Sequence, residues 1–135
     1  MLMTDRIKID HIDHIVLTSK DVNKTIEFYT KILGFQLYTY GEDERKALIF
    51  ADQYKINIHS TDQIYEPKAQ TPTPGSLDLC LISNTPLKEI IAYFKEINLP
   101  IESGPRRRTG ATKLILSIYI RDPDGNLIEI ANEVT

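Results

Sequence analysis

Apolar and polar residues alternate in short runs that predict strands, and between the first two runs the apolar residues recur at helical spacing instead. In the first half of the chain, alternating runs predict four strands, at 13–17, 35–40, 47–50 and 56–59. The helical pattern lies after the first strand, with Asp21 as a candidate N-cap and Gly34 where a left-handed C-terminal residue belongs. The predicted order is therefore β-α-β-β-β.

The same order begins again after a proline-rich segment at 65–75, which we interpret as a linker. Thr85 and Pro86 supply a candidate N-cap and first helical residue for a second helix. The strands predicted in this half are 77–81, 99–101, 114–120 and 127–131. Neither half can bury its own sheet face, so two βαβββ units should pack together. We expect one α+β domain at 9–132, with repeat 1 at about 9–64 and repeat 2 at about 76–132.

Composition narrows the class of protein. The chain has 135 residues, a net charge of -3 and a pI near 5.6, which argue against a general nucleic-acid binder and favour small-molecule partners. The longest apolar runs are too short to span a bilayer, so we expect a cytoplasmic protein without membrane association. The one cysteine, Cys80, lies in an apolar run, where a buried structural thiol is expected.

The tract from Asp122 to Ile130 combines a tight turn with a strand. Pro123 presets φ, the flanking aspartates can bond their own backbone, and Gly125 accepts a positive φ. The tract therefore predicts a hairpin with the strand at 114–120. Alternation places the neighbouring isoleucines on the core face and Glu129 on the other face. Glu129 is either a solvated glutamate on an edge strand or a functional carboxylate.

The repeat brings further polar residues into register with Glu129. In the first strand of each unit, His14 and Asp78 are at matching positions on the face away from the core. Ile56-Asn57-Ile58 likewise matches Ile128-Glu129-Ile130. Pseudo-symmetry therefore groups His14, Asn57, Asp78 and Glu129 around one predicted pocket.

These motifs resemble the vicinal oxygen chelate superfamily, which includes glyoxalase I, extradiol dioxygenases and bleomycin-resistance proteins. The resemblance runs from about Ile9 to Asn132, and its carriers are Asp13-His14-Ile15-Val16-Leu17, the segment from Phe28 to Phe35 and the Asp122 to Ile130 tract. Within the superfamily, Glu66-Pro67-Lys68-Ala69 and Arg108-Thr109-Gly110-Ala111 most resemble glyoxalase domain-containing protein 5-like proteins.

The resemblance implies a cupped mixed sheet around a divalent metal, in a homodimer. His14 matches the first-strand ligand of the family and Glu129 its last-strand carboxylate. The chain departs from the family pattern at Asp78, where metal-dependent relatives commonly have histidine, and at Asn57, where glyoxalase I has glutamate. His59 shares a face with Asn57 and could supply the missing imidazole. His14, His59, Asp78 and Glu129 are the predicted ligands of Mn, Fe, Ni, Zn or Mg.

Such a site favours lyase or isomerase chemistry through a metal-stabilised enediolate on a small polar or anionic substrate. Glu129 or Asp78 could act as the base, and Arg108 and Tyr119 are the other candidate catalytic residues. Arg106 and Arg107, in a predicted loop, are interpreted as a solvated patch. The alternatives are a dioxygenase or thiol transferase of the same superfamily, or a metal-free ligand-binding protein of the bleomycin-resistance type.

Overall fold

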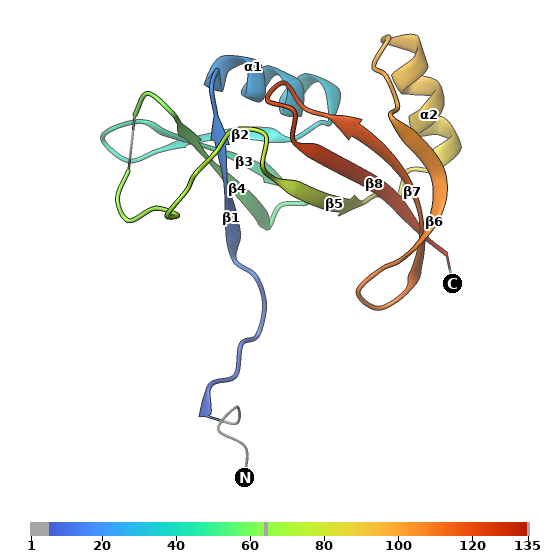
Figure 1. The fold of residues 1–135 in the computed structure, drawn as a ribbon, viewed down its shortest axis with the longest axis horizontal. Coiled ribbons are helices and arrows are strands. Elements are labelled where there is room, and N and C mark those ends of the chain that lie inside the picture. Colours follow the sequence, from blue (N-terminus) through green and yellow to red (C-terminus); the bar gives the residue numbers. More distant parts are fainter. Residues whose placement is uncertain (1–5, 64, 135) are drawn as a thin grey trace.

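The computed structural model describes residues 6–63 and 65–134. Two units of similar order follow one another along the chain (Figure 1). The first unit contains β1 (His14–Ser19), α1 (Val22–Glu27), η2 (Phe28–Ile32), β2 (Gln36–Tyr40), β3 (Arg45–Phe50) and β4 (Tyr54–Ser60). The second unit contains β5 (Asp78–Ile82), α2 (Leu87–Glu96), β6 (Ser103–Thr109), β7 (Leu114–Arg121) and β8 (Leu127–Val134).

Each unit forms its own four-stranded mixed sheet. Sheet 1 has the order β1-β4-β3-β2 and sheet 2 the matching order β5-β8-β7-β6. In each sheet the first and last strands of the unit pair in parallel, whereas the remaining pairs are antiparallel. The predicted α+β fold of two βαβββ repeats is therefore confirmed, including the hairpin of β7 and β8.

The first helical segment begins as predicted but changes its winding. The Asp21 carboxylate accepts a hydrogen bond of 3.2 Å from the Lys24 backbone N–H, which is the expected N-cap. The α-helix then widens into the π-helical turn η2, and Gly34 follows with a φ of 76°. The helical pattern in the sequence located the segment but gave no sign of the π turn.

The second helix is capped by a residue far away in the sequence. Pro86 is the N-cap residue of α2 rather than its first helical residue, and the cap position provides no side-chain hydrogen bond. Instead, the Asn132 side-chain oxygen on β8 accepts from the Leu87 backbone N–H at 2.6 Å, while its amide donates to the Ser83 and Thr85 carbonyls. The prediction of Thr85 as N-cap is therefore wrong, because an asparagine on the neighbouring strand caps the helix.

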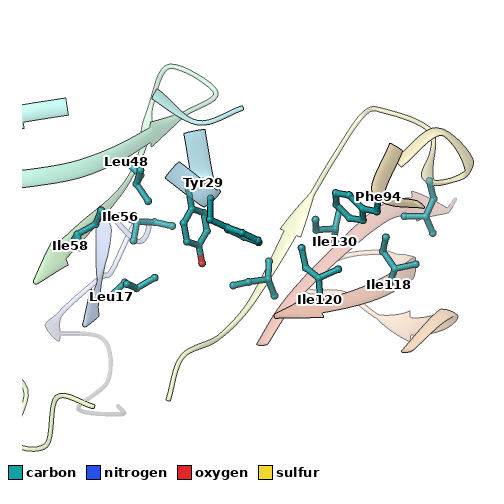
Figure 2. Packing of buried hydrophobic residues seen from close by; sticks show 12 residues of the cluster. Leu17, Tyr29, Leu48, Ile56, Ile58, Phe94, Ile118, Ile120 and Ile130 are labelled. Carbon is teal, nitrogen blue, oxygen red and sulfur yellow. The ribbon is translucent and has the colours of Figure 1, made fainter. Parts of the chain in front are cut away.

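The helices cover one face of each sheet and create the core. Tyr29 of η2 lies between the buried side chains of sheet 1 and those of sheet 2 (Figure 2). Phe94 of α2 is buried in the same cluster. The isoleucines on either side of Glu129 are in this core too, as alternation predicted. No helix among the described residues is long and apolar enough to cross a membrane.

Two other expectations about the second unit are corrected. The predicted strand at 99–101 is absent, and the strand preceding β7 is β6. Arg106 and Arg107 therefore belong to a strand and not to a loop, with Arg106 opposite Ser117 of β7. Backbone pairing with β7 overrides the weak strand propensity of this charged, proline-containing segment.

Candidate functional site

The face of each sheet that carries no helix, here called its helix-free face, holds the polar residues predicted for the site. In sheet 1, strand alternation and register place His14, Asn57 and His59 on this face. In sheet 2, Asp78 and Glu129 occupy the equivalent face. The apolar neighbours of all five residues point to the opposite face and enter the core.

His14 lies at the start of β1. Its Nδ1 is 2.8 Å from a carboxylate oxygen of Asp13, and this contact lowers the pKa of the Asp13 carboxyl. The ring lines a cavity of about 510 Å³ together with residues from the start of β4 and with Leu79 of β5. A carboxylate on one ring nitrogen orients the imidazole and leaves the other nitrogen available to a ligand.

His59 lies at the other end of the same face. In the parallel register, His14 is opposite Lys55 and His59 is opposite Thr18, so four residues, about 13 Å of strand, separate the two histidines. His59 lines a second cavity, of about 500 Å³, whose wall includes Lys68 from the proline-rich segment. Burial, and then the positive charge of Arg45, lower the pKa of His59, which favours the neutral ring.

Two buried polar atoms on the helix-free faces have no hydrogen-bond partner among the described residues: the Asn57 side-chain oxygen and the Ser117 hydroxyl. Asn57 lies between the two histidines along sheet 1, and only 9% of its surface is exposed. A buried unpaired oxygen costs free energy, so such an atom indicates a missing partner. The Asn57 oxygen could bind a cation or accept a hydrogen bond from a ligand.

Glu129 has two cross-strand neighbours on sheet 2. Cys80 of β5 and Tyr119 of β7 are directly opposite it. Burial, followed by the charge of Glu129 and a hydrogen bond to it, raises the pKa of the Cys80 thiol to about 11. Cys80 is exposed, so the prediction of a buried structural thiol is wrong: its strand alternates, and the cysteine lies on the helix-free face.

Arg108 and Tyr119 form a pair beside Glu129. The Arg108 Nε donates a hydrogen bond of 2.8 Å to the Tyr119 hydroxyl, and this contact raises the pKa of the guanidinium. The negative charge of Glu129 acts in the same direction. Because Tyr119 holds the guanidinium at Nε, the terminal amino groups form a fork suited to a carboxylate or phosphate.

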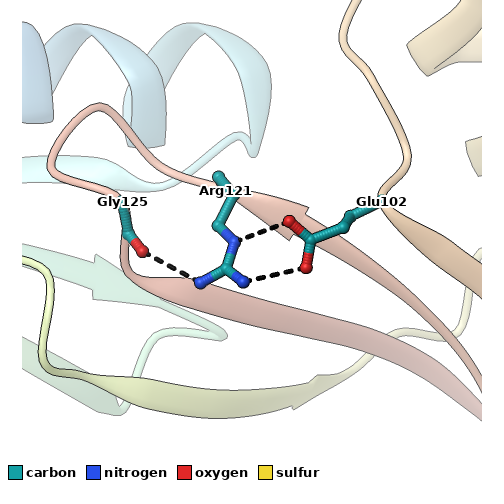
Figure 3. Close-up of polar contacts among 3 residues, drawn as sticks. All are labelled: Glu102, Arg121 and Gly125. Atoms are coloured by element: carbon teal, nitrogen blue, oxygen red, sulfur yellow. Dashed lines mark hydrogen bonds and ion pairs between the residues drawn. The ribbon is translucent and has the colours of Figure 1, made fainter.

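A second arginine contact that involves β7, an ion pair between Arg121 and Glu102, was not expected from the sequence. Arg121 of β7 donates two hydrogen bonds, of 2.9 and 2.8 Å, to the Glu102 carboxylate and a third to the Gly125 carbonyl (Figure 3). The contact lowers the pKa of the Glu102 carboxyl. Glu102 precedes β6, so the pair ties the entry of that strand to the β7–β8 turn. Nineteen residues separate the partners, which is too far for any local sequence signal.

An aromatic and cationic cluster on sheet 1 was also missed. The rings of Tyr38 and Tyr40 stack with centroids 5.4 Å apart, and the Lys55 ammonium lies 4.2 Å from the Tyr40 ring centroid. Lys55 is directly opposite His14 on β1. The alternation of tyrosines at 38 and 40 was the available signal, because residues two apart in a strand share a face.

Within residues 6–63 and 65–134 of one chain, no three histidine, cysteine, aspartate or glutamate side chains gather in a geometry that could hold a metal ion. The predicted ligands instead divide between the helix-free faces of the two sheets. The set of His14, His59, Asp78 and Glu129 therefore stays a prediction.

Comparison with known proteins identifies similar chains. The model of the Glyoxalase/Bleomycin resistance protein/Dioxygenase superfamily matches residues 11–130. Virulence protein STM3117 of Salmonella typhimurium is 53% identical over 126 residues, covering 93% of this chain and 86% of that protein. Its crystal structure superposes with a TM-score of 0.90, covering 95% of this chain and 100% of that chain.

Two further proteins extend this comparison. Glyoxalase domain-containing protein RDO1 of Mycosarcoma maydis is 43% identical over 127 residues, covering 94% of this chain and 70% of that protein. TnmS3, an antibiotic binding protein from Streptomyces, shares the fold with a TM-score of 0.72 at 20% identity, covering 96% of this chain and 100% of that chain.

Proposed function

Because the chain belongs to the Glyoxalase/Bleomycin resistance protein/Dioxygenase superfamily, we propose that it is a metal-dependent enzyme. Its substrate is a small polar or anionic molecule bound through adjacent oxygens, and its chemistry is that of a lyase or isomerase. The resemblance to glyoxalase domain-containing protein 5-like proteins is part of this proposal. The observation that carries it is that His14, on the first strand of one unit, and Glu129, on the last strand of the other, both lie on the helix-free faces of the sheets.

A second copy of the chain completes the proposed site. The donors of one chain divide between its two sheets, so a twofold dimer that faces sheet 1 of one copy with sheet 2 of the other joins His14 to Asp78 and Glu129. Such a dimer contains two identical sites. One imidazole with two carboxylates suits Mn, Fe, Ni, Zn or Mg.

The fourth donor comes from sheet 1. His59 was predicted for this role, and it stays a candidate. Asn57 lies two strand positions closer to His14, and its buried side-chain oxygen has no partner among the described residues. We therefore add Asn57 to the proposed ligands, with His59 as the alternative.

A divalent metal in this site supplies Lewis acidity that stabilises negative charge developing on substrate oxygens. The side chains of the protein provide the remaining chemistry. Whichever of Glu129 and Asp78 is not fully engaged by the metal would accept a proton from the carbon next to a carbonyl. Arg108 binds an anionic group of the substrate through its terminal amino groups, and Tyr119 fixes the position of Arg108.

Elemental analysis of protein purified without chelators tests the metal site. We expect about one divalent ion per chain in the wild type and much less in His14→Ala and Glu129→Gln, since changing even the groups that orient a ligand costs about 10–100-fold in metal affinity. His11→Ala and Glu133→Gln are the matched controls and should retain the metal. Equal metal in all five proteins contradicts the assignment of ligands.

A second function, metal-free ligand binding, is favoured by the stacked Tyr38 and Tyr40 beside Lys55. Tyrosine faces next to an ammonium bind flat, negatively charged rings by stacking and charge attraction. Calorimetry with a planar aromatic carboxylate, comparing wild type with Tyr40→Leu, tests this function. Two results together favour the binding protein over the enzyme. The chelator-treated wild type binds the carboxylate about tenfold more tightly than Tyr40→Leu does, and neither protein takes up metal.

A further inference from the structure

We propose that the segment from Arg6 to Asp13, here called the N-terminal arm, docks on a second copy of this chain. Figure 1 shows the arm projecting away from both sheets. Residues 7–13 form neither helix nor strand. Fully extended, these eight residues reach about 26 Å, which is enough to cross the face of a neighbouring sheet.

The arm carries apolar side chains that are largely exposed in its own chain, although Ile12 lines the cavity beside His14. Ile7, Ile9 and Ile12 are 74%, 83% and 75% exposed, the highest values among the exposed large hydrophobic residues of the described chain. Isolated surface isoleucines are common, but Ile7 and Ile9 are two positions apart, so in an extended segment they lie on one face and form an apolar strip. Such a strip indicates a surface that is covered in the assembled protein.

The backbone of the arm is also unpaired. Among the described residues, no backbone hydrogen bond joins residues 6–13 to the rest of the chain. β1 and β5 are each one of the two edge strands of their sheet, and each pairs with only one neighbour. An extended segment with unpaired N–H and C=O groups can add to such an edge, with alternate side chains contacting the sheet.

Surface features of the same chain fit it as the partner. Val16 on β1 and Ile82 on β5 are exposed apolar residues on these two edges. The arm carries Arg6, Lys8, Asp10 and Asp13, whose charges cancel, so docking it on a copy with a net charge of -3 meets no net repulsion. Exchange of two arms around a twofold axis buries four isoleucines at once, Ile7 and Ile9 of each arm.

The arm leads directly into His14, and this link deepens the proposed function. Docking of the arm holds β1 against the neighbouring copy, beside the carboxylates that the proposed site requires. Only this link to His14 rests on the proposed function. The docking of the arm depends on the apolar strip and the unpaired backbone alone.

Sedimentation equilibrium of the full chain tests the docking. We expect the wild type to be dimeric and the variant Ile7→Asp with Ile9→Asp to have a dimer dissociation constant at least tenfold higher. Lys8→Asp is the matched control, because it changes the net charge by the same two units at a side chain between the isoleucines. The dimer dissociation constant of this control should stay within twofold of the wild-type value. The inference is overturned if the wild type is monomeric. It is also overturned if the dissociation constant of the double variant lies within twofold of the wild-type value.

A photo-crosslinking residue placed at position 9 gives an independent measurement on the full chain. We expect a covalent dimer that the Ile7→Asp substitution reduces severalfold. A crosslink only within one chain overturns the docking. The metal content of the same samples separates the two proposals. A metal-free dimer that depends on the arm contradicts the proposed enzyme. A metal-containing dimer that does not depend on the arm contradicts the docking alone, and a metal-containing monomer contradicts both the docking and the site shared between two copies.

Discussion

The hydroxyl of Tyr29 donates a hydrogen bond of 2.8 Å to the Asp122 carboxyl, across 93 residues of sequence and between the two halves of the fold. Asp122 also accepts from the backbone N–H groups of Asp124 and Asn126, so it organises the turn before β8. Burial, and then the charge of Asp122, raise the pKa of the Tyr29 phenol far above its usual range. The phenol therefore keeps its proton and remains a donor at neutral pH.

Replacing Tyr29 by phenylalanine should lower the free energy of unfolding by about 2 kcal/mol, because a buried hydrogen bond to a carboxyl group is lost. Urea unfolding measures this change. Tyr93→Phe is the control, since the Tyr93 hydroxyl bonds the Ile32 carbonyl at an exposed position and should matter by less than about 1 kcal/mol. Equal effects of the two substitutions would contradict the role of Tyr29 as a buried link.

Substituting Asn132 by alanine should destabilise the protein by about 1 kcal/mol, because α2 loses the cap that Asn132 provides to the Leu87 N–H. Thr85→Ala removes the cap that the sequence suggested and should cost less than about 0.5 kcal/mol. Thermal and urea unfolding of both variants compare these caps. A larger effect at Thr85 would mean that the local cap dominates.

The His59 ring should titrate below its ordinary pKa of 6.5, and Arg45→Gln should move its pKa upward. The unfolded chain then binds more protons than the folded chain as the pH falls below 6.5. The contribution of His59 to stability is therefore present above 6.5 and is lost as the pH falls toward the lower folded value. NMR titration of the ring measures the pKa. A ring that titrates above 6.5 contradicts the predicted burial.

Arg121→Gln should raise the pKa of the Glu102 carboxyl toward its ordinary value of 4.5, because the two hydrogen bonds from the guanidinium are lost. The stabilisation from this pair is present above 4.5 and disappears as the pH falls through the lowered folded pKa. Carboxyl NMR follows the titration. Lys113→Gln, which alters a different exposed ion pair, should leave the Glu102 titration unchanged.

The features that follow from local periodicity could be predicted from the sequence. Alternation placed Glu129 and His14 on the faces away from the core, and the repeat predicted two units with the same βαβββ order along the chain. Turn chemistry also located Asp122 and Gly125, whose φ of 89° matches the expected left-handed conformation. These features depend on neighbouring residues, and short windows of sequence contain that information.

The features that the sequence did not predict depend on residues from distant strands. Asn132 displaced Thr85 as the cap because β8 passes the start of α2. Cys80 is exposed because its strand alternates between core and helix-free faces, although the residues from Leu79 to Ile82 are all apolar. The division of the predicted ligands between two sheets likewise reflects how the halves pack, which periodicity does not specify.

Backbone pairing ends at the boundary between the two halves. Among the described residues, no strand of sheet 1 pairs with a strand of sheet 2, and side chains such as Tyr29 make the connection. A cut within residues 66–75 would break no strand and leave both hydrogen-bonded ladders complete. The chain is therefore suited to fragment complementation: two separately expressed pieces should recombine through their buried side chains, and a reporter could be divided at the same point.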